Sequence, residues 1–499
     1  MKILLVNAPS RRNSIVPPLG LLQVGAILEK AGHEPTIYDP MLEDPMLGPS
    51  SFERIERLIE EIKPSIIGYG GIATSYGSTK RFSSIVKKIK PKIIQIAGGP
   101  LSSVYDLLLE KAGINFIVHG EAELSLPMLI DYLEHNNAVD NIPGISFIDN
   151  KGRIIRNTMA EQVKNLDELP LPAYHLVDFS RYFRHIKETI NLTKENIGSE
   201  KDAREIKERI GLDDRWVEII TGRGCTHKCL FCYRHLKGIR YYSPDYVIKH
   251  IEFLHKMYGL RGFQFADELF NGDRDRVFAI CDAIERSGLN IFYMIGGARV
   301  DKIDYSMLRR LKETGCIEVN YGQESGSDRI LKVYRKGVTA KQNKEITILT
   351  KQIGLNCPVQ IVIGSPEETD ETIRETITFL KEVNGYQYSL NYLIPLPETP
   401  IWGYVKEKRL ISDVEAYLDR VAKYGGQPIV NLTNIKDRKW KKWRFFIKKE
   451  IELDYLKKSG QKYRYLFTYI AYPLLINLYV FLPDRIFNSL KKILKSITS

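Results

Sequence analysis

The chain has 499 residues, 43% of them hydrophobic, which is enough for two to four domains with buried cores. Its six cysteines are too few for a disulfide-stapled secreted scaffold, and the N-terminus lacks a signal-peptide pattern, so we expect a cytoplasmic protein. The net charge is +12, but residues 437–499 hold 15 Lys/Arg and 5 Asp/Glu, which places +10 of it in the tail. The first 436 residues carry only +2, and we expect no nucleic-acid partner.

Residues 1–135 alternate short apolar runs with helical patterns. Strands are predicted at 2–9, 34–40, 65–73, 92–100 and 114–123, and helices that stop at Pro or Gly lie between them. This alternation predicts a doubly wound parallel, Rossmann-like sheet, whose ligand loops follow the carboxyl ends of the strands.

Residues 136–215 are interpreted as a linker and an insertion. A hairpin is predicted to turn at 150–152, a Pro-rich strap follows, and 185–215 is a charged helical insertion without an assigned purpose.

In residues 216–410 the alternation resumes. Six strands are predicted at 217–221, 262–267, 290–300, 316–325, 356–366 and 388–397. Six β/α units indicate a partial (β/α)6 barrel, shorter than a full eight-unit barrel. Residues 411–499 are predicted to form a basic helical C-terminal region.

Three cysteines follow the first barrel strand directly, in the segment GRGCTHKCLFCYR. Three thiolates can ligate three irons of a 4Fe–4S cluster and leave the fourth iron open for a ligand. We predict Cys225, Cys229 and Cys232 as the metal ligands on the catalytic face of the barrel. The alternative is a zinc site completed by a nearby histidine, His227 or His235. The scattered Cys281, Cys316 and Cys357 are expected to be core residues.

The triplet, with Phe231 before its third cysteine, resembles the radical S-adenosylmethionine superfamily. This resemblance implies that the open iron binds S-adenosylmethionine and that an electron from the cluster cleaves it to a 5′-deoxyadenosyl radical. A reductant such as ferredoxin or flavodoxin is then an expected partner.

Later segments resemble the same family in order along the chain. The acidic segment FADELF, which would contact the methionine amino group, offers Asp267 or Glu268, and ARVDKID offers Arg299. The resemblance further assigns cofactor contacts to Glu324, Ser325, Lys336 and Gly364. In the sixth-strand tail, Glu398 stands where the family usually has glycine. Without the resemblance, Asp267 could cap a helix and Arg299 could form a surface ion pair.

The N-terminal region resembles the cobalamin-binding domain that precedes many barrels of this superfamily. The resemblance makes the residues that would approach the corrin Pro17, Gly20, Ser75, Gly98, Gly99 and Gly120. The DxHxxG motif for a lower histidine ligand is absent, and Leu101 stands where the family often has histidine. A domain of this kind that no longer binds cobalamin is the alternative.

With both cofactors, the resemblance implies methylation of an unactivated carbon in a lipid, an isoprenoid or another small molecule. Oxidative cyclisation or carbon–carbon coupling on a lipid or tetrapyrrole is an alternative, as is a non-catalytic cobalamin or redox-binding protein. Fold and cofactor do not choose among these reactions.

The tail offers one clue to the substrate. A basic, aromatic amphipathic pattern precedes residues 466–482, seventeen residues without a charge, which is marginal for a membrane span of about 20. We expect 437–499 either to lie peripherally on the inner face of the membrane or to pack on the barrel.

Overall fold

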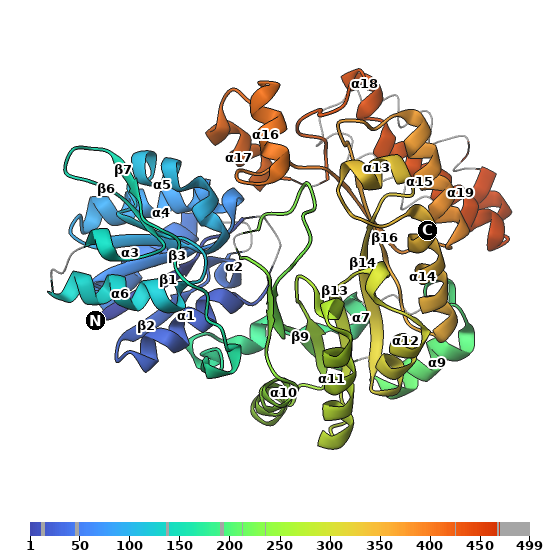
Figure 1. The fold of residues 1–499 in the computed structure, drawn as a ribbon, viewed down its shortest axis with the longest axis horizontal. Helices are drawn as coiled ribbons and strands as arrows, with labels where there is room; N and C mark the ends of the chain where they lie inside the picture. The colour runs from blue at the N-terminus through green and yellow to red at the C-terminus, as the bar shows by residue number, and fades with distance from the viewer. Residues whose placement is uncertain are drawn as a thin grey trace.

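Two seven-stranded sheets with their helices lie side by side in the computed structural model (Figure 1). The structure describes residues 1–10, 15–44, 49–135, 139–189, 194–211, 213–234, 236–424, 426–466 and 469.

The N-terminal sheet has the strand order β2-β1-β3-β4-β5-β6-β7, and its first five strands are parallel. These strands are β1 (Lys2–Asn7), β2 (Glu34–Tyr38), β3 (Ile66–Gly70), β4 (Ile94–Gly98) and β5 (Phe116–Val118). All five predicted strands are confirmed. Alternate residues face opposite layers: Leu5 packs toward α1 (Leu19–Lys30) and α6 (Ala122–His135), whereas Leu4 packs on the other face. That other face is covered by α3 (Pro49–Ile62), α4 (Tyr76–Ile89) and α5 (Tyr105–Lys111); a short α2 (Pro40–Glu43) follows β2.

The predicted hairpin is present, but it is more than a linker. Its strands β6 (Ile145–Ile148) and β7 (Ile154–Arg156) pair antiparallel with each other, and β6 pairs with β5. The N-terminal sheet therefore continues past the expected boundary at 135, because pairing with β6 covers an edge of β5 that would otherwise be open.

The second sheet curls into the partial barrel, and all six predicted strands are confirmed. Its order is β16-β15-β14-β13-β12-β9-β8, with a short antiparallel β8 (Arg184–His185) at one edge. The parallel strands are β9 (Arg215–Ile219), β12 (Gly262–Phe265), β13 (Phe292–Ala298), β14 (Cys316–Glu324), β15 (Val359–Ile363) and β16 (Tyr388–Tyr392). The outer helices are α10 (Pro244–Tyr258), α11 (Arg274–Ser287), α12 (Tyr305–Glu313), α13 (Asp328–Val333), α14 (Ala340–Ile353) and α15 (Asp370–Glu382).

The helical insertion covers the end of the barrel at which its parallel strands begin. It forms α7 (Ile186–Thr189), α8 (Lys194–Ile197) and α9 (Glu200–Arg209). Ile206 and other apolar residues of these helices join one core cluster with Trp216, Phe292 and Ile317, which lie at the beginnings of barrel strands. The insertion thus plugs the end of the barrel opposite the carboxyl ends of its strands.

The C-terminal region packs on both halves of the molecule. α16 (Pro400–Glu407) and α17 (Val414–Ala422) lie at the top of Figure 1 between the two sheets, and α17 contacts α4 of the N-terminal domain. Beyond α18 (Asp437–Trp440), α19 (Trp443–Lys458) packs on α15, where Lys381 pairs with Glu450 at 2.9 Å.

The amphipathic segment of the tail forms α19, and the apolar face of this helix packs on α15. Its apolar residues Trp443, Ile447 and Ile451 are buried in one cluster with α15, so this helix does not present that face to a membrane. Within the described part of the chain, no helix has the length and apolar character needed to cross a membrane. Residues 466–482 lie outside the described residues except for 466 and 469.

Candidate functional site

A small hairpin carries the cysteine loop. β10 (Gly222–Gly224) pairs antiparallel with β11 (Ile239–Tyr241), and all three clustered cysteines lie in the loop between them. Gly224 has a φ of +85°, and an added Cβ would lie 2.5 Å from the carbonyl oxygen of Gly238. Only glycine fits this position, so the loop can begin directly at the strand pair.

Further contacts hold the middle of the cysteine loop against the barrel. The Leu230 N–H donates to the Tyr334 carbonyl at 2.9 Å, and the Ile401 N–H donates to the Leu230 carbonyl at 3.0 Å. Phe231 meets the ring of Tyr334 edge to face at 5.2 Å. The aromatic residue before the third cysteine therefore has a packing role.

Asp267 holds the start of the cysteine loop through hydrogen bonds. One carboxylate oxygen accepts from the N–H groups of Thr221 and Gly222 at 2.6 and 3.0 Å, and the other accepts from the Thr221 hydroxyl at 2.5 Å. Arg276 donates to the Thr221 carbonyl at 2.6 Å. Burial raises the pKa of Asp267, although these hydrogen bonds oppose the shift. Of the two acidic candidates, Asp267 is thus engaged in the loop itself, while Glu268 lines a cavity.

The cysteine thiols lie among charged side chains. A hydrogen bond with Cys232, together with the positive charges of Lys336 and Arg299, lowers the pKa of Cys229 to about 6. The same hydrogen bond raises the pKa of Cys232, and burial raises that of Cys225. A thiolate is therefore favoured at Cys229 near neutral pH, which is the form that ligates iron.

Three thiols on one loop match the donor set of an iron–sulfur cluster, in which each thiolate binds a different iron. In the described ranges, no three His, Cys, Asp or Glu side chains converge as the ligands of one ion would. Thiolates that each bind a different iron of a cluster need no such convergence. Of the two histidines in the zinc alternative, His227 is described and His235 lies outside the described residues.

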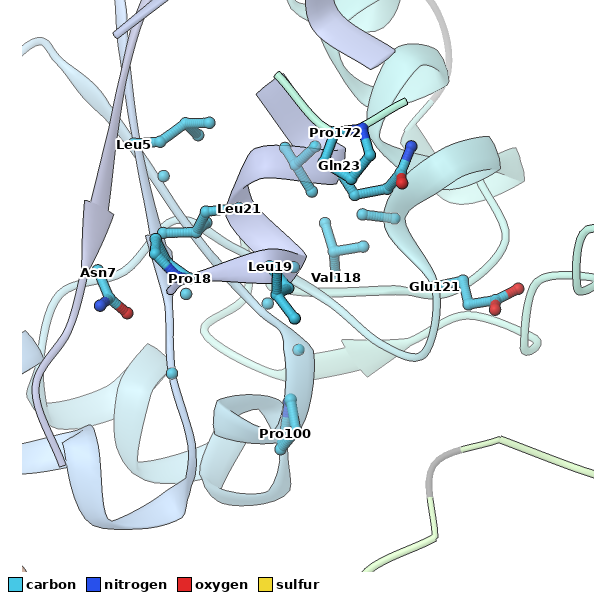
Figure 2. A pocket seen from close by; sticks show the side chains of 18 of the residues that line it. Leu5, Asn7, Pro18, Leu19, Leu21, Gln23, Pro100, Val118, Glu121 and Pro172 are labelled. Atoms are coloured by element: carbon cyan, nitrogen blue, oxygen red, sulfur yellow. The ribbon is translucent and has the colours of Figure 1, made fainter. Parts of the chain in front are cut away.

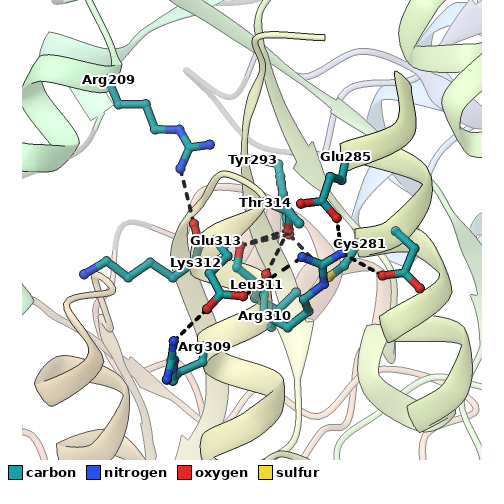
Figure 3. A network of polar contacts seen from close by, with 11 residues as sticks. Arg209, Cys281, Glu285, Tyr293, Arg309, Arg310, Leu311, Lys312, Glu313 and Thr314 are labelled. Atoms are coloured by element: carbon teal, nitrogen blue, oxygen red, sulfur yellow. Dashed lines mark hydrogen bonds and ion pairs between the residues drawn. The ribbon is translucent and has the colours of Figure 1, made fainter. Parts of the chain in front are cut away.

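The scattered cysteines lie in the core, as predicted. Cys281, Cys316 and Cys357 are each at most 2% exposed. Figure 3 shows Cys281 beside Tyr293, whose hydroxyl hydrogen-bonds Thr314 at 2.8 Å between α11 and α12.

Three of the remaining predicted cofactor residues gather next to the cysteines. Glu324 ends β14 with a φ of +62°, a conformation uncommon outside glycine, and its carboxylate lies 3.3 Å from Lys336 Nζ. Arg299 donates to the Lys336 carbonyl at 2.6 Å. Strained backbone of this kind concentrates at ligand-binding sites.

Two further predicted cofactor residues have packing partners in the structure. The Ser325 hydroxyl lies 3.2 Å from that of Thr376 on α15 and accepts from the N–H of Ser327. Gly364 has a φ of +92°, and an added Cβ would lie 3.3 Å from Trp440 Nε1. These contacts hold the loops around the site in place, and the cofactor roles of Ser325 and Gly364 stay predictions.

One cavity of about 550 Å³ is lined by residues from both halves of the molecule. Figure 2 shows part of its N-terminal wall, with Leu5, Pro18 and Val118 among the lining side chains. Its N-terminal wall consists of α1 and the loops after β1, β3, β4 and β5, and its barrel wall includes Gly222, Arg223, Gly224, Ala266 and Glu268. An apolar inner end continues past Leu5 and Val118 into the core. The strand-end loops of the first domain and the start of the cysteine loop thus share one space.

All predicted corrin-contact residues line this cavity, namely Pro17, Gly20, Ser75, Gly98, Gly99 and Gly120. A Cβ added at Gly20 meets no atom within 4 Å, and at Gly98 the nearest atom is 3.5 Å away. The glycines therefore leave room that the protein does not fill, as a flat corrin requires. Ser75 is fully buried and donates to the Ala8 carbonyl at 2.7 Å, so it ties two strand-end loops together.

The described lining of the cavity contains one histidine. His250 Nε2 lies 2.6 Å from the Tyr174 hydroxyl, and burial lowers the pKa of the imidazole to about 4. The ring is therefore neutral near pH 7 and engaged with the connector.

Sequence reasoning missed an ion-pair network at the same cavity. Glu121 lies 3.0 Å from Arg223 and 2.7 Å from Arg240, and Arg223 also lies 2.6 Å from Glu123. Despite burial, hydrogen bonds from the two arginines lower the pKa of Glu121. The acidic residues of HGEAE and the arginine of GRGC were visible signals, but their pairing depends on how the domains dock.

Comparison with known proteins finds two families in the chain. Residues 219–380 match the Radical SAM superfamily and residues 10–130 match the B12 binding domain, more than half of the chain together. An uncharacterized methyltransferase of Pyrococcus horikoshii is 28% identical over 422 residues, covering 82% of this chain and 84% of that protein. An anaerobic magnesium-protoporphyrin IX monomethyl ester cyclase of Synechocystis is 27% identical, covering 83% and 79%.

Two solved structures share the architecture. The cobalamin-dependent S-adenosylmethionine radical enzyme OxsB aligns with a TM-score of 0.69 at 18% identity, covering 95% of this chain and 72% of that one. The radical S-adenosylmethionine methyltransferase TsrM from Kitasatospora setae aligns with a TM-score of 0.64 at 18% identity, covering 82% and 76%. At this identity the likeness establishes the fold.

Proposed function

Because the chain belongs to the radical S-adenosylmethionine superfamily and carries a B12-binding domain, we propose that it methylates an unactivated carbon of a small molecule or lipid. Its cofactors are a 4Fe–4S cluster, S-adenosylmethionine and cobalamin. When bound, the cluster supplies the electron that cleaves S-adenosylmethionine, and cobalamin carries the methyl group. The observation that carries the proposal is the shared cavity, which meets both the corrin-contact glycines and the start of the cysteine loop.

The chain's own residues divide the work between the two halves. Cys225, Cys229 and Cys232 would hold the cluster, and Glu268, Arg299 and the Glu324–Lys336 pair would orient S-adenosylmethionine above it. Gly98, Gly99 and Gly120 would let the backbone approach the corrin face. The apolar walls of the cavity exclude water from reactive species.

Inward-facing positions of the barrel support a substrate with a polar group. Glu218 and Gln264 are register partners on adjacent strands, as are Gln360 and Ser389. Their strand neighbours pack in the outer cores, so these four side chains face the barrel interior and remain only partly buried. Barrel interiors are usually filled with Val, Ile and Leu. Glu218 pairs with Arg184 at 3.4 Å and Ser389 donates to Gln360, so a hydrogen-bonding group that enters from the cofactor end would exchange with these contacts.

Radical cyclisation or coupling is the competing reaction, favoured by the likeness to the cyclase. The two reactions leave different products of S-adenosylmethionine. Methylation consumes one molecule to S-adenosylhomocysteine and a second to 5′-deoxyadenosine and methionine, whereas cyclisation gives 5′-deoxyadenosine without S-adenosylhomocysteine.

The test incubates anaerobically reconstituted enzyme with a reductant, methyl-¹³C-labelled S-adenosylmethionine and a small-molecule and lipid extract of the source cells. The proposal expects both coproducts and ¹³C in one compound of the extract. Formation of 5′-deoxyadenosine alone, with no label transferred, would replace methylation with cyclisation or coupling.

A further inference from the structure

Four charged residues cross the boundary between the two domains at the edge of the cavity. Glu121 and Glu123 follow β5 in the N-terminal domain, while Arg223 lies in β10 and Arg240 in β11 of the hairpin that carries the cysteines. Arg240 donates from both terminal nitrogens to Glu121, at 2.7 and 2.9 Å. Glu121 also accepts from the N–H of Val163 in the connector at 3.2 Å.

The network lies close in sequence to the residues of each predicted cofactor site. Glu121 directly follows Gly120 of the corrin-contact set, and Arg223 precedes Cys225 by two residues. Glu121, Glu123 and Arg223 also line the cavity. A displacement of the cysteine loop relative to the corrin loops therefore has to break or stretch these ion pairs.

Burial makes the network costly to disrupt. The side chains of Glu121 and Glu123 are 5% and 8% exposed, and those of Arg223 and Arg240 are 15% and 16% exposed. Two negative and two positive charges balance, so the loss of one member leaves an uncompensated charge in a poorly solvated place. Charge-assisted, two-point contacts also restrict orientation, which isolated apolar contacts do not.

A second tether joins the domains elsewhere. Glu415 on α17 accepts from the Tyr76 hydroxyl at 2.5 Å and pairs with Lys80 at 2.7 Å and Lys111 at 2.9 Å. Its side chain is 26% exposed, and it does not line the cavity. The molecule therefore offers a matched pair of interdomain contacts, one at the cofactors and one away from them.

We propose that Glu121, with Arg223 and Arg240, is the positioning element that sets the distance and orientation between the corrin and the cluster. This inference rests on both cofactors of the proposed function being bound, and it does not depend on which carbon is methylated. The three residues act through the loops that hold the cofactors and are not themselves catalytic residues.

The test uses the holoenzyme with cob(II)alamin and the reduced cluster, since both are paramagnetic and their spin–spin interaction reports the distance between them. The wild type is expected to give one well-defined interaction. Glu121→Gln removes the charge but keeps the shape, and we expect a broadened or weakened interaction. Because a misplacement near 1 Å can cost about 10²-fold in rate, S-adenosylhomocysteine formation should fall by up to that factor.

Controls separate positioning from folding. Glu415→Gln removes the other tether and should leave the spin–spin interaction unchanged. If Glu121→Gln does not retain both cofactors, the spin–spin interaction is measured in Arg240→Lys instead. Lysine keeps the positive charge but loses the two-point contact, so the same broadening is expected. A loaded variant with a wild-type interaction and wild-type S-adenosylhomocysteine formation would overturn the positioning proposal. A wild type that binds no corrinoid would instead overturn the proposed function.

Discussion

The carboxylate of Asp267 holds Thr221 through both its backbone N–H, at 2.6 Å, and its hydroxyl, at 2.5 Å. Thr221 begins the turn into the hairpin that carries the cysteines. Asp267 therefore supports the start of the cysteine loop, although its segment resembles a cofactor contact. Its neighbour Glu268 lines the cavity.

Replacing Asp267 with Ala should impair cluster assembly. The substitution leaves two buried N–H groups, those of Thr221 and Gly222, without an acceptor, which costs about 1–3 kcal/mol each. We expect reduced iron and sulfide content after anaerobic reconstitution. Glu268→Gln, the matched neighbour, should assemble the cluster normally and bind S-adenosylmethionine more weakly. A fully loaded Asp267→Ala protein with only weaker S-adenosylmethionine binding would assign Asp267 to the cofactor.

Replacing Gly98 with Val should exclude cobalamin and spare the cluster. Gly98 has an extended backbone with a φ of −154°, which valine tolerates, and an added Cβ would occupy the corrin wall of the cavity. Overpacking costs about 1–3 kcal/mol, or about fivefold to more than a hundredfold in affinity. Absorbance of bound corrinoid measures the effect. Gly403→Val on α16, where a Cβ meets no atom within 4 Å, is the control and should bind normally.

The docking of α17 should weaken in acid. Hydrogen bonds from Lys80, Tyr76 and Lys111 lower the pKa of Glu415 to about 2, below its ordinary value of 4.5. A carboxyl with a lowered folded-state pKa stabilises the fold above pH 4.5, and that contribution disappears as the pH falls toward 2. Glu415→Gln should therefore lower the free energy of unfolding by about 1 kcal/mol at pH 7 and flatten its pH dependence between 4.5 and 2. Equal pH dependence in both proteins would refute this assignment.

Membrane contact through the tail stays a prediction. The packing of α19 determines where the chain can be truncated to test it. Because α19 packs on α15, truncation before it would expose the barrel core. Truncation after Gly460 keeps α19 and removes the uncharged run at 466–482. The full chain should sediment with vesicles rich in anionic lipid, and the truncated chain should remain in the supernatant. Equal sedimentation of both would remove the argument for a lipid surface.

Local sequence patterns were sufficient to predict the strands and helices and the order of the site segments along the chain. All predicted strands of both sheets follow from alternating apolar runs, and the cysteine loop follows the first barrel strand as expected. The glycines that are predicted to contact the corrin line one cavity because strand-end loops of a parallel sheet share an edge.

Relationships between distant segments could not be predicted. Glu121 and Arg240 are 119 residues apart, and only the docking of the two domains makes them partners. Ser325 and Gly364 lie in matching segments, yet Thr376 and Trp440 give them packing roles that depend on α15 and α18. The hairpin at β6–β7 was recognised, but its pairing with β5 is a long-range contact that sets the true extent of the sheet.

We propose that one chain holds the cluster and cobalamin around a single cavity. The most direct measurement reconstitutes the wild type and the Cys225→Ala/Cys229→Ala/Cys232→Ala variant with iron, sulfide and hydroxocobalamin, and quantifies iron, corrinoid and 5′-deoxyadenosine. The wild type should bind both cofactors and cleave S-adenosylmethionine, while the triple variant should keep the corrinoid and lose iron and cleavage. Cleavage retained in the triple variant, or a wild type without corrinoid, would contradict the account.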